Sequence, residues 1–155
     1  MSKLEKKIYE KLLEKNYKIA TAESCTGGLV ASTLINVNGA SNIIEMSFVT
    51  YSNEAKIKLV NVNPKTIDKY SVVSEEVAIE MAKGAKEVAK SNIGISTTGL
   101  AGPKGDENHK VGTVCFAIII NETIYAYTKI FKNISRNHIR KAATKYILKK
   151  LLYLL

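Results

Sequence analysis

Residues 17–28, YKIATAESCTGG, contain the strongest signals for the fold, since they predict a strand followed by a sharp turn into a helix. The first five of them, 17–21, include apolar Ile19 and Ala20 and predict a short strand, and residues 29–35 have a helical pattern. A strand that turns sharply into a helix exposes the N–H groups of the first helical turn, which attract negative charge. The stretch therefore predicts a site for acyl transfer or for phosphate binding, and its spacing does not choose between them.

Three candidate nucleophiles, Ser24, Cys25 and Thr26, lie in this turn, and Gly27 and Gly28 follow them. Cys is intrinsically the strongest of the three nucleophiles, but a free Cys is commonly a small buried residue, and no His partner stands at a useful spacing. Thr26 is a good candidate for the N-cap of the next helix, a role also open to Ser24. The backbone amides of residues 26–28 are candidates for an oxyanion hole, and the glycines let a substrate approach closely.

The chain has 155 residues without an obvious linker, so we expect one domain over residues 1–155. Two cysteines predict neither a disulfide framework nor a metal site. The charged first residues lack the apolar core of a signal peptide, and the longest apolar run, residues 114–120, is too short to cross a bilayer. We therefore expect a cytoplasmic protein with no metal, no cofactor and no membrane contact.

The net charge of +9 permits a nucleic acid or an anionic metabolite as partner. Lys supplies nearly all of this charge, since Arg136 and Arg140 are the only arginines in the sequence. Nucleic-acid recognition usually recruits clustered Arg, so the composition favours a Lys-rich surface and no nucleic-acid partner.

Helices alternate with strands early in the chain, and two paired strands come late. The first helix, residues 2–15, opens with capping-box spacing between Ser2 and Glu5. The later elements expected are a strand at 47–52, a helix capped by Asn53, a turn or helix from Pro64, a helix capped by Ser74 whose apolar face includes Val88, a strand at 92–97, paired strands at 112–120 and 123–131, and a helix capped by Ser135.

This order predicts an α/β fold, layered α/β/α, with a mixed, partly parallel sheet and helices on both faces. In such sheets ligands bind at the strand ends. The turns at Ser24, Tyr51 and Thr98 are therefore expected to converge on one pocket, where Thr98 and Gly99 supply a hydroxyl and a flexible backbone.

Five motifs, TAESCTGG, FVTYSNEAK, VSEEVA, TGLAGPKG and VGTV, resemble those of the CinA C-terminal domain family, and the resemblance covers nearly the whole chain. Characterised enzymes of that family are nicotinamide-nucleotide amidases, and this chain is similar to the stand-alone form. The resemblance implies hydrolysis of nicotinamide mononucleotide to nicotinate mononucleotide and ammonia, without metal, by a homodimer or larger assembly. The loop at residues 104–110 departs from the family pattern, because it lacks the Pro that usually precedes VGTV.

Carried onto this sequence, the resemblance implies a Ser/Lys dyad with Ser24 as nucleophile and Lys56 as base, and Tyr51 beside them. Ser41 matches a polar active-site position, and Arg136 and Arg140 match basic positions suited to a substrate phosphate. The substrate-binding residues expected from motif and resemblance together are Thr26, Gly27, Gly28, Ser41, Thr98, Gly99, Arg136 and Arg140.

The implied chemistry makes a specific demand on Lys56, because a lysine acts as a base only when it is neutral. Its pKa, ~10.4 in a model peptide, must fall by several units through burial or neighbouring positive charge. Composition alone predicts an ordinary exposed lysine here, since Lys is rarely buried. The resemblance is what favours a buried base.

Two functions of other classes fit the same sequence. A non-catalytic nucleotide-binding module, linked to competence, would keep the pocket and bind a nucleotide without turnover, and the atypical 104–110 loop motivates it. A nucleic-acid binder would show strongly salt-dependent affinity for DNA or RNA, but the sequence has no Arg cluster or aromatic stacking motif for that role.

Overall fold

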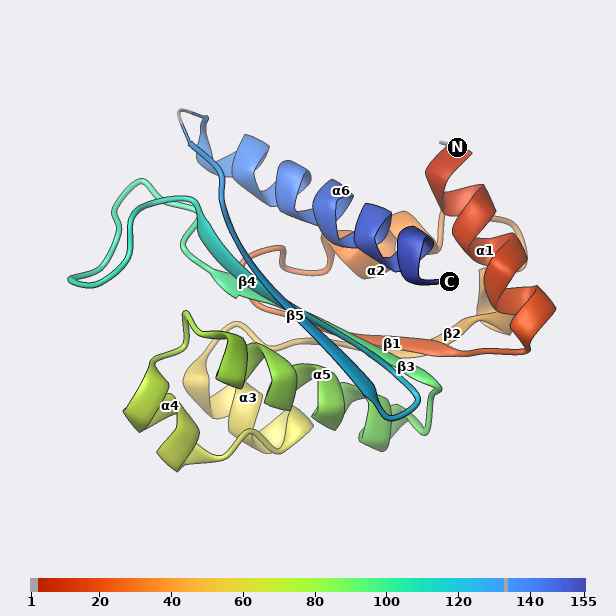
Figure 1. The fold of residues 1–155 in the computed structure, drawn as a ribbon, viewed down its shortest axis with the longest axis horizontal. Coiled ribbons are helices and arrows are strands. Elements are labelled where there is room, and N and C mark those ends of the chain that lie inside the picture. Colours follow the sequence, from red (N-terminus) through yellow and green to blue (C-terminus); the bar gives the residue numbers. More distant parts are fainter. Residues whose placement is uncertain (1–2, 133) are drawn as a thin grey trace.

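The computed structural model describes residues 3–132 and 134–155, and its centre is a five-stranded mixed sheet between two layers of helices (Figure 1). The strand order is β2-β1-β3-β4-β5; β1 is parallel to β2 and β3, and β4 is antiparallel to both its neighbours. The strands are β1 (Ile19–Glu23), β2 (Ile44–Val49), β3 (Ile93–Gly99), β4 (Thr113–Ile120) and β5 (Thr123–Ile130). The predicted α/β layering and mixed sheet are confirmed.

Helices cover both faces of the sheet (Figure 1). Helices α1 (Lys3–Lys15), α2 (Leu29–Leu34) and α6 (Arg136–Leu154) cover one face, and α3 (Asn53–Val60), α4 (Pro64–Tyr70) and α5 (Glu75–Ala89) cover the other. The chain passes from β1 to β2 over the first face and from β2 to β3 over the second. The strand order therefore reverses at β1, and the crevice at the carboxyl ends of such strands is where ligands usually bind.

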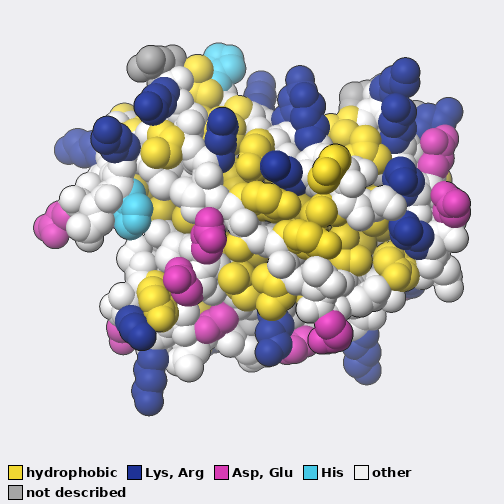
Figure 2. Space-filling view, in the orientation of Figure 1, with side chains coloured by type: hydrophobic (Ala, Val, Ile, Leu, Met, Phe, Trp, Pro, Cys, Tyr) yellow, Lys and Arg dark blue, Asp and Glu magenta, His cyan; other side chains and the backbone are white. Residues whose placement is uncertain are grey.

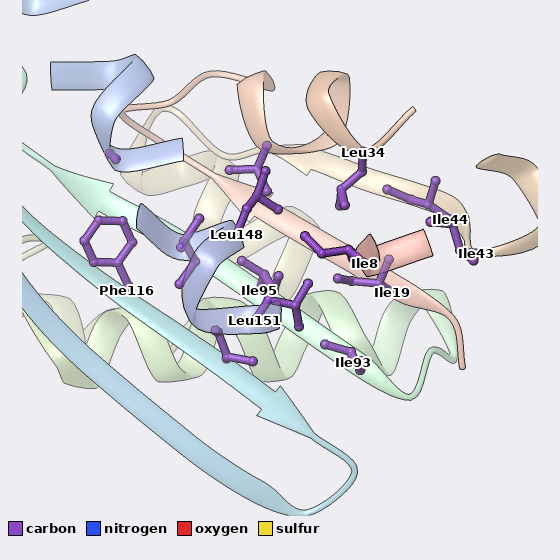
Figure 3. Close-up of a cluster of buried hydrophobic side chains, with 14 of the residues drawn as sticks. Ile8, Ile19, Leu34, Ile43, Ile44, Ile93, Ile95, Phe116, Leu148 and Leu151 are labelled. Atoms are coloured by element: carbon purple, nitrogen blue, oxygen red, sulfur yellow. The ribbon is translucent and has the colours of Figure 1, made fainter. Parts of the chain in front are cut away.

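The sheet is apolar on both sides because both faces are covered, and every residue of β1 is buried. The larger core lies between the sheet and α1, α2 and α6, where Ile8, Leu34, Ile95, Phe116 and Leu148 pack together (Figure 3). Smaller apolar clusters join the opposite face to α3 and α5. These two cores hold the strand ends in a fixed relation to the helices that follow them.

The β5 edge of the sheet is more open than its centre. The hairpin connection at Asn121-Glu122 is as predicted, and β5 pairs with β4 along eight residues. Figure 2 shows hydrophobic side chains gathered on this side of the molecule, over the β4–β5 hairpin. Ile124 is exposed there, while Tyr125 and Tyr127 are half-buried.

Most helix boundaries match the sequence signals, and the caps at Ser74 and Ser135 are confirmed. The cap of α3 is Ser52, whose hydroxyl accepts the Ala55 N–H at 3.0 Å, so the prediction of Asn53 as cap is wrong by one residue. Val88 is 39% exposed in the last turn of α5, so the apolar pattern extends beyond the buried part of that helix. Ser2, the expected capping-box residue, lies outside the described residues.

The register between β1 and β2 changes by one residue near their start. Ile19 pairs with Ile44, but Thr21 pairs with Ser47, so β2 has one residue more than β1 over this interval. An extra residue of this kind re-aims the rest of a strand. From Thr21 onwards the pairing is regular and ends at Glu23 opposite Val49, which brings the two strand ends level.

Within residues 3–132 and 134–155, no helix has the length and apolar character needed to cross a membrane. The same residues contain no group of three or more His, Cys, Asp or Glu side chains placed to hold a metal ion.

Candidate active site

The carboxyl ends of β1, β2 and β3 surround a cavity of about 260 Å³. Three predicted turns, those at Ser24, Tyr51 and Thr98, contribute to its wall, so their predicted convergence is confirmed. The lining residues are Ser24, Cys25, Tyr51, Asn53, Lys56, Val72, Val73, Thr98, Gly99, Leu100, Ala101, Gly102, Lys104 and Arg136.

Two of these side chains form a buried hydroxyl–amine pair. The Lys56 Nζ donates to Ser24 Oγ at 3.3 Å and to the carbonyl oxygen of Thr50 at 3.0 Å. Lys56 is only 2% exposed, and Ser24 is also buried. Burial lowers the pKa of Lys56 below its ordinary value, because the charged ammonium is removed from water. An amine that is neutral more often, within hydrogen-bond reach of a hydroxyl, can accept the hydroxyl proton.

The position of Lys56 follows from the start of α3 immediately after β2. Side chains on a helix point back toward its N-terminus, so the side chain of the fourth helical residue reaches toward the strand ends. The Thr50 N–H donates to the carbonyl oxygen of Glu23 at 2.8 Å, which ties the chain after β2 to the end of β1. This tie brings the amine of α3 beside the turn that carries Ser24.

The turn after β1 is held by the buried carboxylate of Glu23. It accepts hydrogen bonds from the N–H groups of Gly28, Val30 and Ala31 at 3.0, 3.0 and 2.8 Å. The Thr26 hydroxyl donates to the same carboxylate at 2.6 Å. A carboxylate at a helix N-terminus satisfies otherwise unpaired N–H groups and opposes the positive end of the helix dipole. Glu23 therefore accepts the hydrogen bonds of the first N–H groups of α2, and the prediction of Thr26 as the cap of this helix is wrong.

Most of the backbone amides proposed for an oxyanion hole already donate hydrogen bonds within the protein. The Gly27 N–H donates to the carbonyl oxygen of Ser24 at 3.0 Å, and the Gly28 N–H is held by Glu23. Neither glycine lines the cavity, and nor does fully buried Thr26. Both glycines have positive φ, 56° and 95°, so their role in this structure is to allow the tight turn.

The two arginines occupy different places. Arg136 lines the cavity, where its guanidinium donates to the Tyr51 hydroxyl at 2.9 Å and to the carbonyl oxygen of Gly102. Tyr51 is 61% exposed, so this contact lies at the cavity mouth. A guanidinium at the mouth provides a positive charge where an anionic group of a ligand would remain partly solvated.

Arg140 and Ser41 do not line the cavity, in contrast to the sequence prediction. Arg140 donates to the carbonyl oxygens of Cys25 and Thr26, both at 3.0 Å, and so supports the backbone of the turn. Ser41 is exposed in the short 3-10 turn at Ala40–Asn42 that precedes β2, at the opposite end of the parallel strands. Motif position gave no information about the direction in which either side chain points.

Thr98 and Gly99 are at the cavity as predicted. The Thr98 hydroxyl donates to the carbonyl oxygen of Val72 at 2.7 Å, so it joins the end of β3 to the segment between α4 and α5. That segment also supplies Val73, and the two valines form an apolar part of the wall.

Cys25 stands next to Ser24 but in a different environment. Burial raises the pKa of the Cys25 thiol to about 12, so the thiol remains protonated near neutral pH. The lysine amine hydrogen-bonds Ser24 instead. Of the two adjacent candidates, Ser24 is therefore the side chain with a neighbouring base.

Several lining residues escaped the sequence prediction. Asn53 and Lys104 lie inside the YSNEAK and TGLAGPKG motifs, and motif membership was the signal that could have identified them. Val72 and Val73 carry no such signal, because they reach the cavity only through the packing of α4 and α5.

A family model for the CinA C-terminal domain matches residues 1–155. The chain belongs to this family. A CinA-like protein from Petrotoga mobilis is 43% identical over 144 residues, covering 92% of this chain and 36% of that protein. A CinA-like protein from Fervidobacterium nodosum is 45% identical over 138 residues, covering 88% of this chain and 34% of that protein. The chain thus spans about a third of the length of these curated relatives.

Solved structures of CinA superfamily proteins have the same fold. A competence-damaged protein (CinA) superfamily protein from Escherichia coli superimposes with a TM-score of 0.94 at 36% identity, covering 98% of this chain and 88% of that one. A competence/damage-inducible protein from Agrobacterium tumefaciens gives a TM-score of 0.92 at 31% identity, covering 99% of this chain and 96% of that one.

Proposed function

We propose that this CinA-family chain hydrolyses the carboxamide of nicotinamide mononucleotide to give nicotinate mononucleotide and ammonia. The observation that carries the proposal is the buried amine of Lys56, 3.3 Å from the hydroxyl of Ser24. The resemblance of the chain to nicotinamide-nucleotide amidases supports the choice of substrate.

In the first half of the reaction, Ser24 Oγ attacks the carboxamide carbon while Lys56 Nζ takes the hydroxyl proton. The resulting ammonium lies beside the developing oxyanion and stabilises its charge. Lys56 then returns the proton to the leaving nitrogen, the C–N bond breaks, and ammonia departs from a nicotinoyl ester on Ser24.

In the second half, a water molecule takes the position vacated by ammonia. Lys56 accepts a proton from this water as it attacks the ester carbon, and the same proton passes to Ser24 Oγ when the ester bond breaks. The sum is one water consumed and one amide converted to a carboxylic acid, which passes its remaining proton to ammonia or solvent to become the carboxylate, with both side chains returned to their starting state.

The cavity mouth suits the rest of a mononucleotide. Arg136 and Lys104 supply positive charge among the lining residues, so a substrate phosphate at the mouth would meet two cationic side chains. The apolar wall of Val72 and Val73 suits an aromatic ring deeper in the cavity. At about 260 Å³ the cavity is slightly smaller than the ~300–1,000 Å³ of typical small-molecule sites, so it suits the nicotinamide end of a free nucleotide whose phosphate stays at the mouth.

The test is an incubation of the purified chain with nicotinamide mononucleotide, in which ammonia and nicotinate mononucleotide are both quantified. We expect equimolar products from the wild type and a loss of about 10⁴-fold or more in kcat for Ser24→Ala. Cys25→Ala is the matched variant one residue away and should lose no more than about tenfold, because its thiol is not ionised.

If Ser24→Ala released product as fast as the wild type, Ser24 could not be the nucleophile. Saturable binding of the nucleotide without any turnover would instead favour the nucleotide-binding module. Calorimetric titration of the wild type and of Ser24→Ala with the nucleotide measures binding separately from turnover and so distinguishes these outcomes.

A further inference from the structure

A second and larger concavity, of about 460 Å³, lies among α1, α2 and α6 and shares no lining residue with the catalytic cavity. Its surface is mainly apolar, with Leu4, Leu29 and Leu148 each coming from a different helix. We call this concavity the α6 groove. A concave site lined mainly by apolar side chains with a few polar groups is a common form of binding site.

One wall of the α6 groove is a row of lysines, Lys141, Lys145 and Lys149. Residues four apart lie on the same side of a helix, so the three ammonium groups form a row about 12 Å long. In Figure 2 blue Lys and Arg side chains gather along the top of the view, where α6 runs in Figure 1.

Within residues 3–132 and 134–155, no ion pair neutralises this row. No Asp or Glu occurs anywhere in residues 135–155, and none of the ion pairs among the described residues involves these three lysines. Glu5 is the one acidic residue among the described residues that line the groove, so the groove carries a net positive charge.

We propose that the α6 groove binds an acidic amphipathic helix of a partner protein. The apolar residues of such a helix would cover Leu4, Leu29 and Leu148, and its carboxylates, repeated every four residues, would face the lysine row. The length of the row corresponds to two to three helical turns, which matches the contact of a docked helix.

Other occupants fit the groove less well. A second copy of this chain, with a net charge of +9, offers no excess of carboxylates to complement the lysine row of this groove. A nucleic acid or a bilayer surface would meet the lysines but would leave a concave apolar floor uncovered, and a fatty acid would bring one negative charge to three positive ones.

The experiment uses the full chain and a fluorescein-labelled 18-residue helical peptide with a leucine stripe flanked by glutamates. Fluorescence anisotropy should show saturable binding of this peptide. Binding should weaken at least about tenfold with Lys141→Glu/Lys145→Glu/Lys149→Glu, because attraction along the row becomes repulsion. The matched control is Lys65→Glu/Lys69→Glu/Lys83→Glu on α4 and α5, which changes the net charge equally on the other face and should leave binding within about twofold.

Two peptide controls separate groove docking from general charge attraction. A peptide of the same composition with the leucines scattered around the helix should bind at least about tenfold more weakly, because it cannot present one apolar face. Equal binding of the scattered peptide, equal weakening by both triple variants, or tighter binding of dodecanoate, anionic vesicles or an oligonucleotide at this site would each overturn the proposal. Ammonia release by the triple variants is an independent readout and does not enter the test.

Discussion

The Ser24–Lys56 cavity and the α6 groove are both lined by lysine, yet the two sites place that residue in opposite surroundings. Lys56 is 2% exposed and is held by the oxygens of Ser24 and Thr50. Lys141, Lys145 and Lys149 stand in solvent beside an apolar surface. The difference shows that removal from water, more than residue type, makes a lysine available as a base, whereas an exposed lysine provides a fixed charge for recognition.

Removal of the buried Lys56 amine is the strongest test of this contrast, because we expect its effect on kcat to be the largest. Lys56→Met keeps the unbranched side chain up to the Cε position but lacks the terminal amine and so has no proton acceptor, and kcat for ammonia release should fall about 10⁴-fold or more. Lys141→Met in the groove is the paired control and should keep wild-type kcat. Equal activity of the two variants would contradict the role of Lys56.

Replacement of the buried carboxylate of Glu23 should produce the next largest effect, a loss of stability. Glu23 accepts five hydrogen bonds from the surrounding hydroxyl and N–H groups. In Glu23→Gln an NH₂ donor would face N–H donors, and we expect a loss of about 2–4 kcal/mol in the free energy of unfolding by urea.

The control for Glu23 is Glu122→Gln, since the Glu122 side chain is 99% exposed. This variant should change the free energy of unfolding by less than about 0.5 kcal/mol. Similar losses in both variants would mean that the Glu23 network contributes little to the turn.

The pH dependence of stability tests the same contrast without the substrate. Burial lowers the pKa of Lys56 in the folded chain, so the unfolded chain binds more protons and this group makes stability rise with pH. The rise should occur between the lowered pKa and the unfolded value of ~10.4. In Lys56→Met this contribution is absent, so the stability of the wild type relative to the variant should increase from pH 7 to pH 10 in urea titrations. If the difference in free energy of unfolding between the two proteins stayed constant or fell, the lowered pKa of Lys56 would be contradicted. Cys25 is present in both proteins, so its contribution largely cancels in this difference.

The smallest effect is expected at the groove. Replacing Lys141, Lys145 and Lys149 together by Ala removes exposed charges that form no ion pair with residues 3–132 or 134–155, so the free energy of unfolding should change by less than about 0.5 kcal/mol per site. Thermal unfolding followed by circular dichroism gives the value. A large loss would show that the lysine stems stabilise α6 and are not a free recognition surface.

Much of the fold follows from local signals in the sequence. Residues 17–28 combine a strand, a turn and a helix start, and Ser74 and Ser135 are caps that the structure confirms. Local spacing fails where neighbours in space decide the outcome. Glu23 looks like one more strand residue until the amides of α2 are placed around it, and only then is Thr26 displaced from the capping role.

For the candidate site, the motifs located the turns but not the direction of every side chain. Arg136 and Arg140 are one helical turn apart, yet one lines the cavity and the other supports the backbone behind Cys25. Ser41 lies in the turn that Gly39 signals in the sequence, but this turn precedes β2 and so lies at the end of the strand away from the cavity. Periodicity predicts which residues share a face and gives no information about what that face contacts.

The extra residue of β2 between its pairings with Ile19 and Thr21 has a consequence for chemistry several residues away. A strand advances about 3.3 Å per residue, which equals the whole separation between Lys56 Nζ and Ser24 Oγ of 3.3 Å. A shift of β2 by one residue against β1 would therefore break this contact. Deletion of the extra residue would not cause such a shift, because it restores one-to-one pairing between Ile19–Ile44 and Thr21–Ser47 and leaves Glu23 opposite Val49. A one-residue deletion between Val49 and Lys56, after the last paired residues, has no irregularity to absorb it and would turn the amine away from Ser24.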